Sequence, residues 1–301
     1  MRKSFLQVGK TRFAFITTCY NSKPTANSGI SSSTMDSGSK DFSKSIPLFF
    51  LHGFPTTSAL WSSVISELEN DFPCVALDIP GFGDTTIPLD MERDIESNSE
   101  AIHRFASALS LETAHIVAHG SGCANALALA LQRPGFVKSL FLINPQFGDN
   151  LPGLFMRSIK IIAKNNFSWN LAFKTKSIYF LLEKGLRKTM VRNELSDQIM
   201  QEFLRPLKNS PSARLRFQKF LNDFNPRLTS TLTGHLKKIK IPVTIVSGEN
   251  DKISTSEWGS NFSKKFTNAR HHIIENTGNV LPLESPLQLS DIILQSMDSV
   301  F

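Results

Sequence analysis

The sequence has little cysteine and no long apolar run, and these two absences exclude several classes of protein. Its 301 residues include three cysteines, Cys19, Cys74 and Cys123, at unrelated spacings. This small, odd number argues against a disulfide framework or a zinc site and is typical of a reducing compartment. The densest apolar run, residues 46–51, is only as long as a strand, so no transmembrane helix is expected. We therefore expect a cytoplasmic protein without a metal or another cofactor.

Two further features are missing from the sequence. Residues 1–13 have a basic start, but Lys10 and Arg12 interrupt any apolar run, so a signal peptide is not expected. Neither a Gly-rich phosphate loop nor an aromatic-plus-basic RNA motif is present, so nucleic acid is not an expected partner.

Acidic residues are scarce in one segment of the chain. Residues 155–240 carry 18 Lys and Arg against 5 Asp and Glu, a net charge of +13, whereas the whole chain has +7. We interpret the excess as the solvated surface of a helical segment. The alternative is attraction to an acidic partner or an anionic lipid surface.

Apolar strands and amphipathic helices alternate from residue 46 onward. The stretches "IPLFFL", "CVALDIP", "HIVAH" and "VKSLFLINP" each predict a buried strand, with predicted helices between them. Two opening strands are predicted over residues 4–8 and 11–19. Continuous apolar strands alternating with helices indicate an α/β fold, in which helices cover both faces of a parallel sheet.

Two segments interrupt this alternation. Residues 21–45 contain nine serines and are predicted to form a flexible surface insertion. Between about residues 149 and 235 only helical periodicity is present, and the strand–helix alternation returns at "IPVTIVSGEND". We predict an α/β core formed by residues 1–148 and 236–301, with a helical cap over 149–235 inserted after the sixth strand.

Five stretches occur in an order that is informative as a set. They are "LHGFP" at 51–55, "LDIPGFGDT" at 77–85, a strand-to-helix turn at 117–123, "GEND" at 248–251 and "GNVLPLESP" at 278–286. With these stretches the sequence resembles the α/β-hydrolase fold superfamily, in its cap-bearing branch. The resemblance implies a mostly parallel, doubly wound sheet with an apolar pocket under the cap.

Members of this superfamily usually carry G-H-S-x-G-G at a tight strand-to-helix turn, where the serine is the nucleophile. In one alignment, His119 keeps the histidine and Gly120 takes the place of the nucleophile. In the other alignment Ser121 is the nucleophile, and His119 and Cys123 replace the flanking glycines. We favour the first, because an imidazole does not suit a crowded position that requires a small side chain.

The two other catalytic positions follow from the same resemblance. Asp251 matches the acid of the superfamily, whereas Asn279 occupies the position of its histidine. A carboxamide has no basic nitrogen near neutral pH, so it cannot accept a hydroxyl proton as an imidazole does. The resemblance also implies an oxyanion hole formed by the backbone N–H groups of Phe54 and Ser121. We expect the side chains of Asp251 and Asn279 to be neighbours.

Three hypotheses about function remain open. The favoured hypothesis is a pseudoenzyme without nucleophile and base, which binds a small apolar molecule or a protein partner without hydrolysis. The second is a non-hydrolytic enzyme, such as a cyclase, lyase or isomerase, that uses the pocket and the oxyanion hole. The third is an active ester hydrolase in which Ser121 is the nucleophile.

Overall fold

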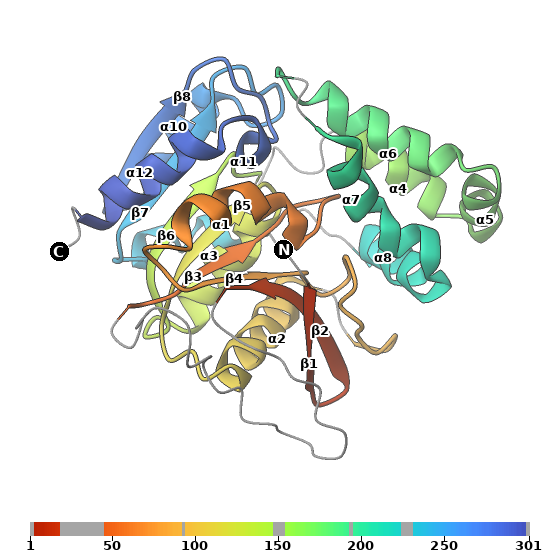
Figure 1. Cartoon of the computed structure of the whole chain (residues 1–301), viewed down its shortest axis with the longest axis horizontal. Helices are drawn as coiled ribbons and strands as arrows, with labels where there is room; N and C mark the ends of the chain where they lie inside the picture. Colours follow the sequence, from red (N-terminus) through yellow and green to blue (C-terminus); the bar gives the residue numbers. More distant parts are fainter. Residues whose placement is uncertain are drawn as a thin grey trace.

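A computed structural model gives the structure of the protein (Figure 1). The residues it describes are 3–18, 45–91, 94–146, 154–192, 195–223 and 231–298. The serine-rich segment predicted over 21–45 therefore lies almost wholly outside the described residues. Within the described ranges, no helix is both long enough and apolar enough to cross a bilayer.

The described strands form one eight-stranded sheet in the order β1-β2-β4-β3-β5-β6-β7-β8. Strand β2 pairs antiparallel with β1 and β4, and all other neighbours pair in parallel. The mostly parallel sheet with flanking helices confirms the predicted fold class. The strands are β1 (Lys3–Val8), β2 (Thr11–Thr17), β3 (Leu48–Leu51), β4 (Cys74–Leu77), β5 (Ala114–His119), β6 (Val137–Ile143), β7 (Val243–Gly248) and β8 (Ala269–Ile274).

The central strands are buried along their whole length because helices flank the sheet. Every residue of β3, β4, β5 and β7 is buried. Helix α2 packs against α3, and α1 packs against α12. The flanking helices are α1 (Ser62–Leu68), α2 (Ile95–Ala108), α3 (Gly122–Gln132), α10 (Ser256–Ser263), α11 (Leu281–Glu284) and α12 (Pro286–Asp298).

Short polar side chains begin several helices by accepting a hydrogen bond from a free backbone N–H group of the first turn. Asp94 does this for α2 and Thr255 for α10. Helix α1 begins differently, because the 3-10 turn η1 (Ser58–Trp61) runs directly into it.

Five described helices follow β6 along the chain before β7 begins. Figure 1 shows them in green and cyan, beside the sheet and away from α12. We call residues 154–223, without the gap at 193–194, the helical segment. Its helices are α4 (Leu154–Ala163), α5 (Asn166–Lys174), α6 (Ser177–Lys188), α7 (Asp197–Asn209) and α8 (Pro211–Asp223).

Aromatic rings pack the helical segment onto the core. Phe217 of α8 stacks on Phe54 at 5.7 Å between ring centroids, and Phe220 meets Phe82 at 4.5 Å. Phe155 of α4 lies 5.8 Å from Phe54. Because Phe54 and Phe82 follow β3 and β4, this contact forms at the carboxyl ends of the parallel strands, where ligands bind in open α/β sheets.

Candidate functional site

A tight turn joins β5 to α3, and Gly120 lies at its tip. Gly120 has φ +55°, a left-handed conformation that costs glycine little and other residues more. The Gly120 carbonyl accepts hydrogen bonds from the N–H groups of Cys123 and Gln146. A Cβ atom built on Gly120 would lie 3.7 Å from Gln146 Nε2, in ordinary contact. The turn thus has room for a side chain at residue 120 but a backbone that favours glycine.

The turn is pressed against the loop after β3. A Cβ atom on Gly122 would collide with the carbonyl oxygen of His52, and one on Gly53 would lie 2.7 Å from the carbonyl oxygen of His119. Both contacts are too close for any residue except glycine. This approach brings the Phe54 backbone beside Ser121.

Ser121 lies at the N-terminus of α3, next to the tip of the turn. Its hydroxyl accepts a hydrogen bond of 2.9 Å from the backbone N–H of Phe54. The Phe54 N–H, predicted as one donor of an oxyanion hole, thus donates to the Ser121 hydroxyl, and the oxyanion hole itself stays a prediction. Within the described ranges, no histidine ring hydrogen-bonds the Ser121 hydroxyl.

The structure brings Asp251 and Asn279 together, as the sequence predicts. Asn279 Nδ2 donates a hydrogen bond of 2.8 Å to Asp251 Oδ2. On its other side, Asn279 Oδ1 accepts from Gln146 Nε2 at 3.4 Å. Because Gln146 also lies beside Gly120, the side chains of Gln146, Asn279 and Asp251 follow one another from the turn at Gly120.

The backbone of Asn279 is held by two buried side chains to which the sequence assigned no role in the site, His119 and Asn144. His119 Nε2 donates to the Asn279 carbonyl oxygen at 2.7 Å, and Asn144 Nδ2 donates to the same oxygen at 2.9 Å. Burial lowers the pKa of His119 to about 4, so its ring is neutral near pH 7. Only the position of His119 beside the turn could have indicated this role.

The carboxyl group of Asp251 has an unusual pKa. Burial raises it to about 6, although hydrogen bonds from the Asn279 amide and the Ile253 N–H lower it in part. Removal from water disfavours the charged form, and that effect dominates here. A carboxyl with this pKa can exchange a proton near neutral pH.

A cavity of about 630 Å³ lies between the core and the helical segment. Its size falls within the range of small-molecule sites in proteins. Most of the lining is apolar, and Asn279 and Gln146 are its polar contacts with the candidate site. The lining residues are Phe54, Pro55, Gln146, Phe155, Met156, Gly185, Leu186, Lys188, Thr189, Lys252, Ile253 and Asn279.

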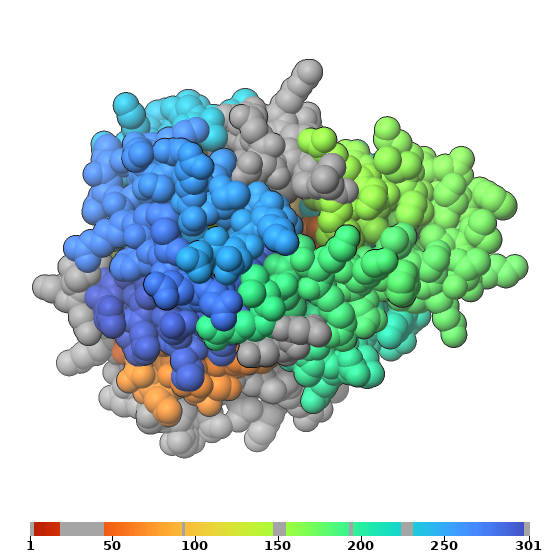
Figure 2. Space-filling model, turned by 90° about the horizontal axis from the view of Figure 1, so that it is seen from above, coloured from red at the N-terminus to blue at the C-terminus, as the bar shows by residue number. Residues whose placement is uncertain are grey.

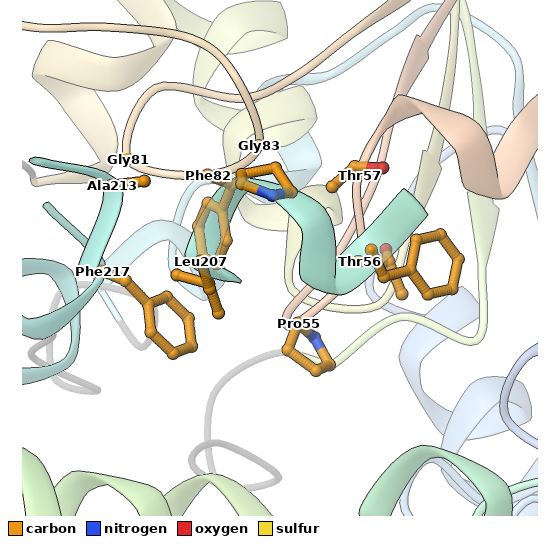
Figure 3. Close-up of a pocket in the computed structure, with 11 residues that line it drawn as sticks. Pro55, Thr56, Thr57, Gly81, Phe82, Gly83, Leu207, Ala213 and Phe217 are labelled. Carbon is orange, nitrogen blue, oxygen red and sulfur yellow. The ribbon is translucent and has the colours of Figure 1, made fainter. Parts of the chain in front are cut away.

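A second, much smaller hollow also borders Pro55 (Figure 3). Its volume of about 10 Å³ leaves space for roughly one water molecule. Figure 3 shows Phe82, Leu207 and Phe217 around it, from the loop after β4 and from α7 and α8. The helical segment is therefore tightly packed on the core at α7 and α8 and leaves space beneath α4 and α6.

Comparisons with known proteins agree with this architecture. A family model described as alpha/beta hydrolase fold matches residues 46–286. Over 260 residues the chain is 25% identical to monoacylglycerol lipase ABHD6 of Mus musculus, which covers 84% of this chain and 76% of that protein. It is 36% identical over 104 residues to the Arabidopsis thaliana protein named "Probable lysophospholipase BODYGUARD 2", or 33% of this chain and 22% of that one.

A solved structure shares the whole fold. The crystal structure of haloalkane dehalogenase DbeA from Bradyrhizobium elkani superposes with a TM-score of 0.78 at 16% identity. The match covers 99% of this chain and 98% of that chain. At this identity the likeness concerns the fold alone.

The prediction of a pseudoenzyme that binds without hydrolysis is wrong, because relatives that match most of the chain are named as lipases. That prediction rested on the side chains at Gly120 and Asn279 alone. It gave too little weight to the Ser121 hydroxyl, which the turn holds against the Phe54 N–H group. The assignment of catalytic roles to Ser121, Asp251 and Asn279 stays a prediction.

Proposed function

Because the chain belongs to the alpha/beta hydrolase fold family, we propose that it is an ester hydrolase acting on lipid-like substrates. The observation that carries the proposal is the match to monoacylglycerol lipase over 84% of the chain. The mainly apolar cavity supports it, since a fatty acyl chain gains free energy when it leaves water for such a space. We propose a cytoplasmic location from the low cysteine content. The match to monoacylglycerol lipase does not test this location.

We assign the substrate class as single-chain lipids with an ester bond near a polar head. The apolar lining of Phe155, Met156 and Leu186 suits an acyl chain, whereas Lys188 and Lys252 suit a polar or anionic head. Monoacylglycerols and lysophospholipids have this form. The names of the relatives point to the same two classes.

Ser121 is the candidate nucleophile. Its hydroxyl lies at the N-terminus of α3, whose partial positive charge stabilises an alkoxide. The hydrogen bond that it accepts from the Phe54 N–H acts in the same direction. Attack of Oγ on the ester carbonyl would form the acyl-enzyme, while the hydroxyl proton passes to the base and from it to the departing alcohol. A water molecule would then hydrolyse the acyl-enzyme, releasing the fatty acid and returning the proton to Ser121.

Asp251 is the candidate proton acceptor. With a pKa of about 6 it is ionised in most molecules at neutral pH, yet basic enough to take up a proton. It lies one hydrogen bond behind Asn279, which lines the cavity. Asn279 and Gln146 are carboxamides, which orient Asp251 but do not carry a proton. We propose that a water molecule in the cavity passes the Ser121 proton to Asp251.

The experiment measures fatty acid released from 1-oleoylglycerol and from oleoyl-lysophosphatidylcholine by the full chain. We expect turnover by the wild type, with Ser121→Ala lowering kcat by at least about a hundredfold because it removes the nucleophile. Labelling by a fluorophosphonate should depend on Ser121 as well. Ser66→Ala, at an exposed site on α1, is the matched control and should not change either result.

Two outcomes would contradict parts of this proposal. Absence of release from both lipids, by protein with a normal melting transition, would contradict ester hydrolysis. If Ser121→Ala retains turnover that Asp251→Asn loses, Ser121 is not the nucleophile, and attack by a water molecule on the ester replaces the acyl-enzyme route.

A further inference from the structure

Large apolar side chains point into solvent on three consecutive helices of the helical segment. Ile161 of α4, Phe167 of α5 and Phe180 of α6 are 69%, 76% and 64% exposed. Leu171 of α5 is exposed as well. Helix α5 packs against both α4 and α6, so these side chains lie on neighbouring helices. Exposed phenylalanines grouped in this way mark an interaction site more often than an ordinary surface.

The helices that carry these apolar side chains are also rich in cations. Residues 154–188 contain eight Lys and Arg and a single acidic residue, Glu183. Lys164, Lys174, Lys176 and Lys184 are all exposed. Lys184 Nζ lies 5.5 Å from the ring of Phe180, so charge and apolar surface meet on α6. We call Ile161, Phe167, Leu171, Phe180 and these four lysines the basic–apolar patch.

The patch lies at one end of the molecule. Figure 1 shows α4, α5 and α6 together at the edge farthest from α12. In Figure 2 the same residues, yellow-green to green, project from the rest of the protein. A broad, flat partner can thus approach them without meeting the core.

We propose that the basic–apolar patch binds the surface of an anionic lipid membrane. Helices that lie at a membrane interface combine a lysine-rich polar face with phenylalanine and leucine side chains that enter the acyl boundary. Lysine stems lie along apolar surface while their ammonium groups reach the lipid headgroups. A net charge of this sign matches the negative potential of membranes with acidic lipids.

The position of the cavity supports a lipid surface over a protein partner. Phe155 and Met156 of α4 and Leu186 of α6 line the cavity, while Ile161 and Phe180 of the same two helices face solvent. A single-chain lipid leaving the membrane beneath the patch would therefore reach the cavity past these two helices. This membrane site extends the proposed ester hydrolysis but does not depend on it, because vesicle binding needs no turnover.

The test is cosedimentation of the full chain with sucrose-loaded vesicles of phosphatidylcholine alone or mixed with phosphatidylserine. We expect binding to the mixed vesicles at low salt, weaker binding as ionic strength rises, and little binding to phosphatidylcholine alone. Phe167→Ser with Phe180→Ser should weaken the partition coefficient by at least about tenfold. Lys164→Gln, Lys174→Gln and Lys184→Gln together should weaken it by roughly a hundredfold, about fivefold for each lysine.

Matched controls separate the patch from general charge and apolarity. Leu287 on α12 is 61% exposed, so Leu287→Ser removes an apolar side chain elsewhere. Lys237→Gln, Lys238→Gln and Lys240→Gln remove three exposed lysines outside the helical segment. The partition coefficient of both control variants should stay within about twofold of the wild type. The lysine control should show only the small effect of its lower net charge.

Three results would overturn the proposal. They are absence of binding to mixed vesicles at low salt, equal loss of binding in patch and control variants, and a vesicle-free dimer that only the patch variants abolish. The last result would assign the patch to a second copy of the chain. If the phenylalanine variant does not fold, the lysine variant and the salt series decide.

Vesicle binding without lipid hydrolysis would contradict only the proposed function, and hydrolysis of dispersed lipid without vesicle binding would contradict only this inference.

Discussion

Asp251 shows that burial can control the pKa of a residue more than its hydrogen-bonded neighbours do. Its carboxyl accepts hydrogen bonds from the Asn279 amide and from the N–H of Ile253. Amide donors stabilise a carboxylate less than a cation does, so burial remains the dominant influence on its pKa. The result is a carboxyl that holds its proton at mildly acidic pH.

This raised pKa makes a prediction about stability. The pKa of Asp251 is about 6 in the folded protein, against 3.8 for an aspartate freely exposed to water. Between these values the folded state keeps a proton that the unfolded state releases, so the free energy of unfolding falls as pH rises. Asp251→Asn removes this dependence. From about pH 4 to about pH 7, the stability of the variant relative to the wild type should rise by about 2 kcal/mol.

Urea unfolding at a series of pH values measures this difference. Asp71→Asn, at an exposed site, is the control and should show a constant difference from the wild type. A pH-independent difference for Asp251→Asn would mean that Asp251 is ionised throughout and that its burial does not control its pKa.

At the scale of elements, the apolar pattern of the sequence predicted the strands and helices but not the contacts between distant segments. Strands and helices follow from periodicities of two and 3.6 residues, which a local stretch of sequence contains. The neighbours Asp251 and Asn279 followed from a resemblance between motifs. The contact of Gln146 with Asn279 joins residues 133 positions apart, and that of Glu284 with Val191 joins residues 93 apart. Nothing in the local pattern of either partner indicates such a pair.

Glu284 connects the end of α6 to the loop that carries Asn279. Its buried Oε2 accepts hydrogen bonds from the N–H groups of Val191, Arg192 and Gly278 at 2.7, 3.0 and 3.2 Å. The N–H of Asn279 also donates to the carbonyl of Thr189 at 2.8 Å. One carboxylate thus holds together two segments that both contribute to the cavity.

Removing this carboxylate should loosen both segments. Glu284→Ala leaves three N–H groups without their acceptor, and we expect a loss of about 3 kcal/mol in the free energy of unfolding. Glu284→Gln keeps one acceptor oxygen and should lose less. Hydrogen exchange at the amides of Val191, Arg192 and Gly278 should become faster in the alanine variant.

The control for this prediction is Glu249→Ala. Glu249 Oε2 accepts a single, exposed hydrogen bond from the N–H of Asn276 at 3.0 Å. Its loss should change stability by about 0.5 kcal/mol or less. Equal losses in the two alanine variants would show that Glu284 does not hold the two segments together.

At the scale of the whole molecule, a chain of charges joins the first strand to the helical segment. Lys3 Nζ of β1 lies 2.6 Å from Asp78 and 3.1 Å from Asp84. Arg205 of α7 lies 2.6 Å from Asp84. Burial would raise the pKa of Asp78, but the Lys3 ammonium and other contacts outweigh it and lower that pKa. Asp78 is therefore a fully buried carboxylate whose charge depends on Lys3.

Lys3→Met should be costly because it leaves Asp78 buried without its cation. We expect a loss of about 3 kcal/mol in the free energy of unfolding at neutral pH. Combining it with Asp78→Asn removes the buried charge, so the double variant should lose less than the sum of the single variants, with a coupling of about 2 kcal/mol. Lys10→Met, in the exposed turn between β1 and β2, is the control and should change little.

The pH dependence of the Lys3→Met variant gives a second, independent measurement. The lowered pKa of Asp78 contributes stability above the pKa of an unfolded aspartate, and that contribution is lost as pH falls through the lower folded value. The variant lacks the contribution, so its deficit against the wild type should shrink as the pH falls below about 4. A deficit that stays constant with pH, or additive losses in the double variant, would mean that Lys3 stabilises the fold through packing of its alkyl chain and not through its charge.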